Sequence, residues 1–413
     1  MAGAETRYLP YGRQCIDEAD IAAVVAALRS AYLTTGPTVT AFETRLAETL
    51  DVPHAAACAN GTAALHLACA ALGLGESDAV IVPSITFLAT ANAPRMTGAE
   101  VVFADVDPDN GLMQPHHLAE ALARADAAGL RVRAIFPVHL AGQCADLPSL
   151  GEMARARGIA VVEDACHALG GAYARGGQGF APVGSCLDSD LTVFSFHPVK
   201  NIATGEGGAV TTRDAKLAQR LERLRCHGMV REPAQFRQPE MAFDDEGPAN
   251  AWYYEMPELG WNYRLSDIHA ALGLSQLGKL ARFVGERARL AALYDAQLAP
   301  LAPRIAPIAR SGVCRSGWHL YSVLIDFAGL GVTRAELMRR LHARGIGTQV
   351  HYIPVHRQPY YRARYGLTNL PGANAYYART LSLPLFVGMS ERDVARVCEG
   401  LSDAIDVPAE AAE

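Results

Sequence analysis

The stretch LTVFSFHPVKNIATGEGGAV, residues 191–210, is the part of the sequence that predicts the fold most directly. Its first apolar run, Leu191–Phe196, predicts a buried strand that carries Ser195 and leads through a His-Pro turn to Lys200. A Gly-rich loop then enters a second apolar run, Gly208–Thr212, so the backbone must pass close to another part of the chain there. Most lysines lie on the protein surface. A lysine sheltered between two buried strands can instead have a lowered pKa and act as an imine-forming amine, and we expect this of Lys200.

Further apolar runs precede this stretch, and alanine-rich segments with helical patterning separate them. The runs are Ala79–Ser84, Glu100–Val106, Arg133–Leu140 and Gly158–Asp164. The helical segments are Thr62–Leu72, Gln114–Ala123, Leu147–Arg157 and Asp214–Cys226. Runs that are apolar throughout indicate strands buried on both faces, and their alternation with helices predicts βαβ units. The predicted fold class is therefore α/β, with a mostly parallel sheet.

Several of these runs end in polar residues, namely Asp105, His139, Asp164 and Ser195. A polar residue after a strand often does no more than begin a turn. In an open α/β sheet, however, ligands bind outside the carboxyl ends of the strands. Several such ends together favour a binding site at this edge of the sheet.

The pattern changes after about residue 280, where a long helical stretch is followed by HLYSVLID, TRAELMRRLHARGI and TQVHYIPV. This order of helix, strand, helix and strand predicts a smaller α+β domain that ends in a helix near SERDVARVCEGLSDAI. We expect an N-terminal segment (1–30), a large domain (31–280) and a small C-terminal domain (281–413). The segment 229–251 is predicted to be a long loop, and such loops are often functional.

Composition limits the classes of function. Of the 413 residues, 50% are hydrophobic and 19% charged, and the net charge of −6 argues against a nucleic-acid binder with a basic surface. Nine cysteines without a C-x-x-C pair predict free thiols in a reducing cytoplasm, with neither a disulfide framework nor a metal site. The N-terminal sequence lacks a signal-peptide pattern, and no apolar run approaches the roughly 20 residues that span a bilayer. We therefore expect a cytoplasmic protein without a membrane partner.

Three other features complete a possible site. In HAAACANGTAALHLACA, Gly61 permits a close backbone approach, Thr62 can cap the following helix, and the first-turn N–H groups can bind a phosphate. Asp164 follows a buried run and can keep a pyridine nitrogen protonated, whereas Glu163 points to the opposite face. Phe87 can stack on a cofactor ring or belong to the core. Phosphate turn, acid and Lys200 occur in the order expected of a site for pyridoxal 5′-phosphate (PLP).

The sequence resembles the PLP-dependent nucleotide-sugar aminotransferases of the aspartate-aminotransferase fold, the DegT/StrS group. The resemblance covers nearly the whole chain and rests on LTTGP, NGTAALHL, ITFLATANA, FADVDPD, PVHLAGQ, EDACHALGG, SFHPVKNIATGEGGAV, ELGWNYRLSDIHAALGLSQL, WHLYSVLID and VHYIPVHRQPYY. It implies PLP fold type I, with a large domain around a mostly parallel sheet and a smaller C-terminal domain. SFHPVK, WYYEMPELGWNYR and HYIPVHRQPYY are most similar to the branch that aminates a sugar in pseudaminic acid biosynthesis.

The resemblance implies roles for particular residues. Lys200 would form the Schiff base with PLP and move the proton between substrate and cofactor. Asp164 would bind the pyridine nitrogen, and Phe87 would stack on the ring. His167, where many relatives carry Gln, would contact the cofactor near its phenolic oxygen. The phosphate would be held by Gly61, Thr62 and Ser195, together with Asn262 from the neighbouring subunit of a homodimer.

The nucleotide-sugar pocket would be lined by Tyr32, Thr34, Thr35, His351 and Tyr352. Arg264 is a candidate for binding the carboxylate of the amino donor, and an ion pair at a surface or interface is an equally good reading.

The implied reaction is a ping-pong transfer of the amino group of L-glutamate to C4 of a UDP-4-keto-6-deoxy-N-acetylhexosamine. A dTDP-3-keto, dTDP-4-keto or GDP-4-keto sugar would use the same cofactor residues. A sugar 3-dehydratase of this fold would carry His in place of Lys200, and a nicotinamide-dependent oxidoreductase would need G-x-G-x-x-G after its first strand. A regulator that retains the fold would not need an intact set of Lys200, Asp164 and Ser195.

Overall fold

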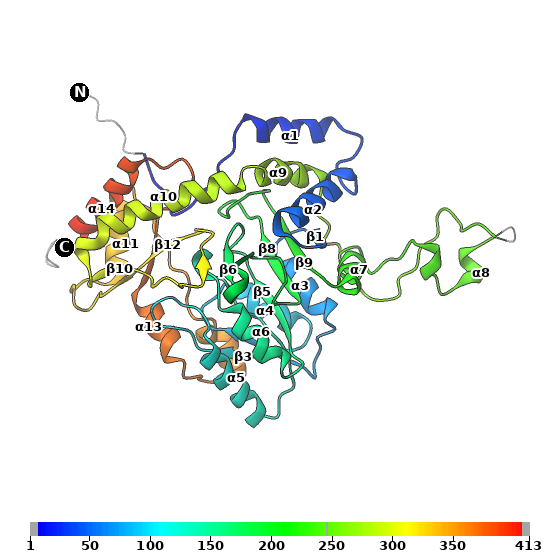
Figure 1. The fold of residues 1–413 in the computed structure, drawn as a ribbon, viewed down its shortest axis with the longest axis horizontal. Helices are drawn as coiled ribbons and strands as arrows, with labels where there is room; N and C mark the ends of the chain where they lie inside the picture. The colour runs from blue at the N-terminus through cyan, green and yellow to red at the C-terminus, as the bar shows by residue number, and fades with distance from the viewer. Residues whose placement is uncertain (1–6, 245–246, 407–413) are drawn as a thin grey trace.

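The computed structural model describes residues 7–244 and 247–406. In this part of the chain, a seven-stranded sheet in the order β1-β9-β8-β5-β4-β2-β3 forms the centre of the molecule (Figure 1). Its strands are β1 (His54–Cys58), β2 (Ala79–Pro83), β3 (Glu100–Ala104), β4 (Val132–Ile135), β5 (Ala160–Asp164), β8 (Leu191–Ser195) and β9 (Gly208–Thr212). Strand β9 runs antiparallel to both neighbours, and the other neighbouring pairs are parallel. The predicted α/β class with a mostly parallel sheet is confirmed.

Each central strand is buried on both faces because its side chains alternate between two apolar layers. In β2, Val80 and Val82 belong to the cluster on one face, whereas Ile81 belongs to a cluster on the other. In β8, Val193 and Phe194 divide between two clusters in the same way. Burial on both sides accounts for the continuous apolar runs in the sequence.

Helices cover both faces of the sheet. One cluster contains residues of α3 (Gly61–Ala71), α4 (Leu88–Met96), α7 (Ala215–Leu224), α12 (Pro359–Tyr365) and α13 (Pro371–Arg379). The opposite clusters contain residues of α2 (Pro37–Leu50), α5 (Pro115–Ala127), α6 (Leu147–Arg155) and α9 (Asp267–Leu277). Helix α1 (Glu18–Arg29) packs on α9, where the Asp20 carboxylate accepts hydrogen bonds from Ser275 and Gln276.

A second core lies beside the first, around a smaller antiparallel sheet in the order β10-β12-β13. Its elements are β10 (Ile305–Pro307), β12 (Tyr321–Ile325), β13 (Thr380–Leu383), α11 (Arg334–Ala343) and α14 (Glu391–Asp406). The long helix α10 (Leu280–Leu298) joins the two cores, since Phe283 packs in the first and Tyr294 in the second (Figure 1). The domain boundary after residue 280 stays a prediction.

The strand predicted at TQVHYIPV is not formed. Residues 348–354 make one isolated bridge, between Gln349 and Ser382, and several of them line a cavity instead. The third strand of the small sheet is β13. A short sheet of β6 (Ala172–Ala174), β7 (Phe180–Pro182) and β11 (Cys314–Arg315) completes the fold.

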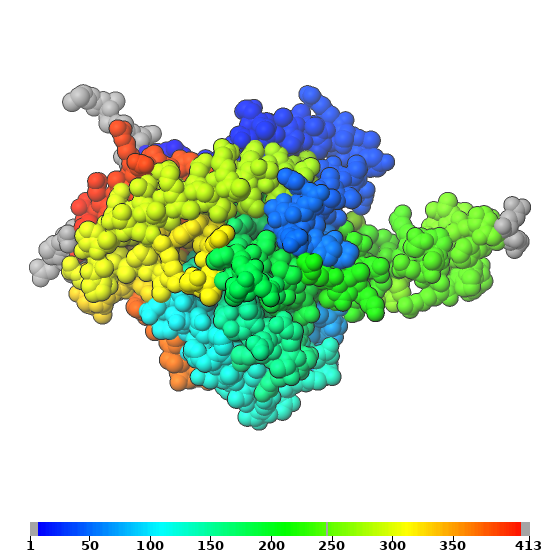
Figure 2. All heavy atoms as spheres, in the orientation of Figure 1, coloured from blue at the N-terminus to red at the C-terminus, as the bar shows by residue number. Residues whose placement is uncertain are grey.

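The predicted loop at 229–251 is part of an arm that projects from the body of the molecule (Figures 1 and 2). It carries the short helix α8 (Pro239–Ala242), and a bridge between Val230 and Glu255 brings its two sides together. Its surface includes several exposed apolar side chains: Met241, Trp252, Tyr254, Met256 and Leu259. No helix in the described ranges is long and apolar enough to cross a membrane.

Candidate active site

A cavity of about 780 Å³ opens at the carboxyl ends of the central strands, where the sequence predicts a site. Its walls come mainly from residues around the central sheet and from residues 349–353 of the segment that leads into α12, and Tyr11 and Gln358 also contribute. Nine of the predicted site residues line it: Gly61, Thr62, Phe87, Asp164, His167, Ser195, Lys200, His351 and Tyr352. Residues that are far apart in the sequence are thereby brought to one place.

The turn before α3 forms one end of the cavity. The predicted cap at Thr62 is wrong, because Asn60 caps the helix with its side-chain oxygen 2.8 Å from the N–H of Ala63. The helix therefore starts at Gly61, and the Thr62 side chain lines the cavity. The N–H groups of Gly61 and Thr62 precede the first helical hydrogen bond and are available to an anion.

Glycines allow this turn to lie against β8 and β9. A Cβ at Gly61 would lie 2.8 Å from the Cβ of Ser195, and one at Gly208 would lie 2.5 Å from the carbonyl oxygen of Asn60. The close backbone approach predicted for the Gly-rich loop is therefore an approach to the phosphate turn. The Ser195 hydroxyl lies at the same end of the cavity.

Asp164 ends β5 and is buried. One carboxylate oxygen accepts the Thr90 hydroxyl at 2.6 Å, and the other accepts the N–H of Cys166 at 3.2 Å. Because Thr90 donates to the carboxylate, the Thr86 hydroxyl, 2.7 Å away, must donate to Thr90. This chain of donors fixes the Asp164 carboxylate in place as an acceptor beside the cavity.

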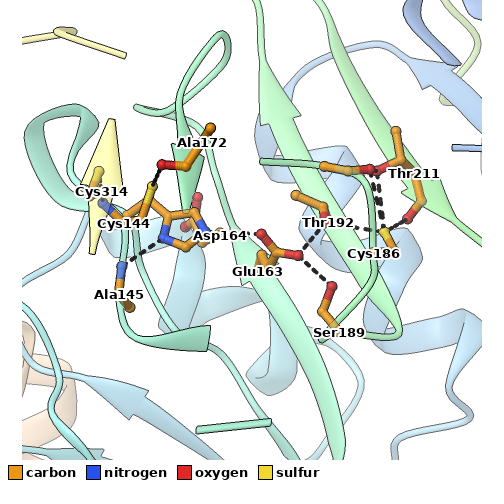
Figure 3. Close-up of polar contacts among 12 residues, drawn as sticks. Cys144, Ala145, Glu163, Asp164, Ala172, Cys186, Ser189, Thr192, Thr211 and Cys314 are labelled. Carbon is orange, nitrogen blue, oxygen red and sulfur yellow. Dashed lines mark hydrogen bonds and ion pairs between the residues drawn. The ribbon is translucent and has the colours of Figure 1, made fainter. Parts of the chain in front are cut away.

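The neighbouring acid, Glu163, is fully buried. Figure 3 shows its carboxylate with the hydrogen bonds to Ser189 and Thr192. Its carboxylate accepts hydrogen bonds from His139, Ser189 and Thr192. The ring of His139 carries its proton on Nε2, because Nδ1 accepts the N–H of Ala145 at 3.0 Å. Glu163 is therefore a structural acid, which supports the strand that presents Asp164.

Lys200 lies half-buried on the cavity wall, in the turn between β8 and β9. Burial lowers the pKa of its amine, while the nearby Asp164 and Cys166 act in the opposite direction. A lysine with a lowered pKa has a larger neutral fraction near neutral pH, as a nucleophilic amine and a general base require. The prediction of a sheltered lysine agrees with this arrangement.

Buried histidines stand behind Lys200. Burial, together with the charge of Lys200, holds the pKa of both His167 and His319 well below the usual range. The same causes lower the pKa of His351 to about 3, and its Nδ1 lies 2.8 Å from the Ser382 hydroxyl. The imidazole rings are therefore neutral at physiological pH.

Phe87 precedes α4 and exposes 55% of its surface, although it is a large aromatic residue. It lines the cavity, and its ring centroid lies 6.0 Å from that of Tyr352. An exposed aromatic face at a cavity is available for stacking on a planar ligand.

The remaining predicted residues do not line this cavity. Tyr32, Thr34 and Thr35 are exposed near the start of α2. Asn262 is exposed, although the next residue, Tyr263, lines the cavity. Arg264 donates a hydrogen bond to the sulfur of Cys226 at 3.3 Å. Their predicted roles in binding stay predictions.

Some lining residues were missed from sequence. Tyr11 and Gln349 line the cavity from positions outside the quoted motifs, and Gln358 lines it from within VHYIPVHRQPYY, where it was given no role. Thr90 lies in an alanine-rich helix, and the sequence gives no sign that its hydroxyl meets Asp164.

The residues of this cavity fit PLP. A helix N-terminus with free N–H groups suits a phosphate, a fixed buried carboxylate suits a protonated pyridine nitrogen, and a sheltered lysine suits an aldehyde. The exposed face of Phe87 suits the ring.

Comparison with known proteins supports this assignment. Residues 14–402 match the DegT/DnrJ/EryC1/StrS aminotransferase family. The spore coat polysaccharide biosynthesis protein SpsC of Bacillus subtilis is 37% identical over 408 residues, which cover 98% of this chain and 99% of SpsC.

Solved structures agree. Helicobacter pylori PseC, an aminotransferase of pseudaminic acid biosynthesis, superposes with a TM-score of 0.84 at 28% identity, covering 97% of this chain and 99% of PseC. The putative sugar aminotransferase Spr1654 of Streptococcus pneumoniae, in its PLP form, superposes with a TM-score of 0.82 at 28% identity over 96% and 98% of the chains. The predicted fold type I and the predicted cofactor are therefore confirmed. This chain belongs to the DegT/DnrJ/EryC1/StrS family and is a PLP-dependent sugar aminotransferase.

Proposed function

We propose that the enzyme moves the amino group of L-glutamate to C4 of a UDP-4-keto-6-deoxy-N-acetylhexosamine, in the biosynthesis of a pseudaminic acid-type sugar. The observation that carries the reaction type is the meeting of Lys200, Asp164 and the Gly61 turn in one cavity. The similarity to PseC over nearly the whole chain supports the choice of sugar.

The residues of the chain divide the work. The Gly61 turn and Ser195 would hold the phosphate of the cofactor, and Phe87 would pack against its ring. PLP supplies an electron sink that acidifies the C–H bond next to the amino group. Asp164, held by Thr90, keeps the pyridine nitrogen protonated and so strengthens this sink.

Lys200 moves the proton. Lys200 would hold the cofactor, and when its amine is free and neutral it would take up the proton from the carbon of the donor that carries the amino group. The lowered pKa of Lys200 favours this role as a base. The same residue works in the opposite direction when the keto-sugar receives the amino group.

Other nucleotide sugars are the alternative. A dTDP-3-keto, dTDP-4-keto or GDP-4-keto-6-deoxyhexose would meet the same Lys200 and Asp164, because the difference lies in the sugar and nucleotide pocket. The SpsC similarity supports a polysaccharide sugar in general.

The test is a direct assay of purified, PLP-loaded enzyme with L-glutamate and a panel of these keto-sugars. We expect 2-oxoglutarate and the 4-amino sugar to appear in equal amounts with the UDP substrate, and Lys200→Ala to abolish both. Faster turnover of a dTDP or GDP sugar would replace the substrate proposal. Absence of 2-oxoglutarate with every sugar would refute glutamate as the donor.

We also propose a homodimer that shares its active sites. The arm and the exposed residues Tyr32 and Leu33 offer apolar surface to a second copy, and Asn262 is exposed and does not line the cavity of its own subunit. In this proposal Asn262 binds the phosphate in the partner's cavity, and Tyr32, Thr34 and Thr35 contact the sugar nucleotide.

Mixed dimers test this arrangement. Lys200→Ala and Asn262→Ala subunits are inactive or weak alone, but one site of a mixed dimer combines an intact Lys200 with an intact Asn262. Remixing equal amounts should restore about a quarter of the wild-type activity. No recovery, although light scattering shows exchanged dimers, would place Asn262 outside the shared site.

A further inference from the structure

Ala141, His167 and Tyr352 form a hydrogen-bonded chain on the cavity wall. The N–H of Ala141 donates to Nδ1 of His167 at 3.3 Å, and Nε2 of His167 lies 2.9 Å from the hydroxyl oxygen of Tyr352. A backbone N–H can only donate, so Nδ1 is the acceptor and the proton of the neutral ring lies on Nε2. His167 therefore donates to Tyr352, and the direction of the chain is fixed.

Both side chains are neutral. Burial, with the charge of Lys200, holds the pKa of His167 well below its usual range. Burial raises the pKa of Tyr352 well above its usual range, and the nearby Asp164 adds to this. Tyr352 therefore keeps its proton. Its oxygen already accepts from His167, so its O–H is left to donate elsewhere.

The surroundings show where that proton can go. Tyr352 lines the cavity, with its ring 4.8 Å from that of His351 and 6.0 Å from that of Phe87. Within residues 7–244 and 247–406, no hydrogen bond takes the Tyr352 proton. Phe87 and Lys200 line the same cavity as Tyr352, so a ligand bound there could supply the acceptor for this proton.

We propose that the Ala141–His167–Tyr352 chain presents the Tyr352 hydroxyl to a negatively polarised oxygen of the molecule bound in this cavity. Tyr352 is the residue that touches the ligand, and His167 is a positioning residue that acts through Tyr352. The phenolic oxygen of the cofactor and an oxygen of the keto-sugar both have this chemistry. The inference rests on the proposed function only for the identity of the sugar.

The Tyr352→Phe variant tests the proposal because it keeps the ring and removes the donor. Tyr361→Phe is the matched control: its hydroxyl bonds Asn92 at 2.7 Å, and Tyr361 is buried in the core outside the cavity. The first readout is the absorbance spectrum of bound PLP across pH, without any substrate. Other titratable groups also face this region, so the spectra are compared between variants at each pH. These groups are Tyr11, Cys166, Asp164, Lys200 and the three buried histidines.

The two possible acceptors give different results. A shifted band or a shifted spectral pKa in Tyr352→Phe, absent in Tyr361→Phe, identifies the cofactor oxygen. An unchanged spectrum with a roughly tenfold lower kcat/KM for the keto-sugar, and an unchanged half-reaction with the amino donor, identifies the sugar oxygen. No change in either readout overturns the proposal. If wild-type enzyme converts no sugar, the proposed substrate fails, whereas the spectral result still stands.

Two measurements test the role of His167. In a double-mutant cycle, His167→Phe should add little to the loss in Tyr352→Phe, because it acts through the same hydroxyl; additive losses would contradict this. In protein labelled with ¹⁵N-histidine, the signal that disappears in His167→Phe should show a protonated Nε2 and an unprotonated Nδ1. The opposite tautomer would reverse the chain and overturn the proposal.

Discussion

Acidification should destabilise the protein through His351, which is buried and neutral in the native state. Its native pKa is about 3, whereas a histidine in an unfolded chain has a pKa of about 6.5. Between these values the unfolded chain binds more protons than the native protein, so stability falls as the pH falls. From about pH 7 to about pH 5, linkage gives a loss of about 2 kcal/mol for this one residue.

His351→Asn isolates that contribution, because the Asn amide can still reach the Ser382 hydroxyl and has no charge to gain. Urea unfolding of the PLP-free protein at both pH values should show a smaller acid loss in the variant, by about 2 kcal/mol. PLP is removed because a bound cofactor has its own pH-dependent affinity. His342→Asn, at an exposed histidine, is the control. Equal acid sensitivity of wild type and His351→Asn would refute the reasoning.

Three further changes have defined outcomes. Thr90→Val should weaken PLP binding about tenfold or more, because it removes a hydrogen bond to the Asp164 carboxylate. In the same spectroscopic titration, Thr90→Ser should retain most of the affinity, and an equal loss in both variants would count against the hydrogen bond. Gly61→Ala should also lower PLP affinity by about tenfold or more, because its Cβ meets that of Ser195 at 2.8 Å, whereas Gly75→Ala, with open space around it, should not. Cys314 should be alkylated first among the cysteines at about neutral pH, because hydrogen bonds from the thiol and the N–H of Cys144 lower the pKa of the Cys314 thiol. The N–H of Cys144 lies 3.0 Å from the sulfur of Cys314. Mass spectrometry that finds Cys15 or Cys226 modified first would contradict this.

The sequence predicts the central sheet well because burial on both faces leaves a plain signal. The run predicted at Ala79–Ser84 became β2 (Ala79–Pro83), since both layers of the core need apolar side chains there. The apolar pattern does not show whether a strand runs parallel or antiparallel to its neighbours. Gly208–Thr212 is as apolar as its neighbours but runs antiparallel, which is set by the short connection back from Lys200.

The same apolar signal misled at TQVHYIPV. Its valine and isoleucine suggest a strand, but Val350 and Ile353 line the cavity and make no ladder with the small sheet. Apolar residues that line a ligand site have the same composition as a buried strand. Over so short a stretch, hydrophobic periodicity does not distinguish a strand from a cavity-lining segment.

The location of a candidate residue at the cavity could be predicted where a strand or a turn places it, as with Asp164 and Lys200. The side chains that tune such residues could not be predicted, because their partners come from distant segments. Thr90 meets Asp164 across 74 positions of sequence, and no local pattern reports such a contact.

His167 shows most clearly what a residue's identity leaves open. A histidine after a buried strand can donate or accept at either ring nitrogen, and the sequence does not say which. Here the choice depends on Ala141, whose backbone adopts a left-handed conformation with φ of 58° and points its N–H at Nδ1. That conformation costs a non-glycine residue about 1–2 kcal/mol. Because the surrounding fold holds it, one strained alanine assigns the His167 proton to the side that faces Tyr352.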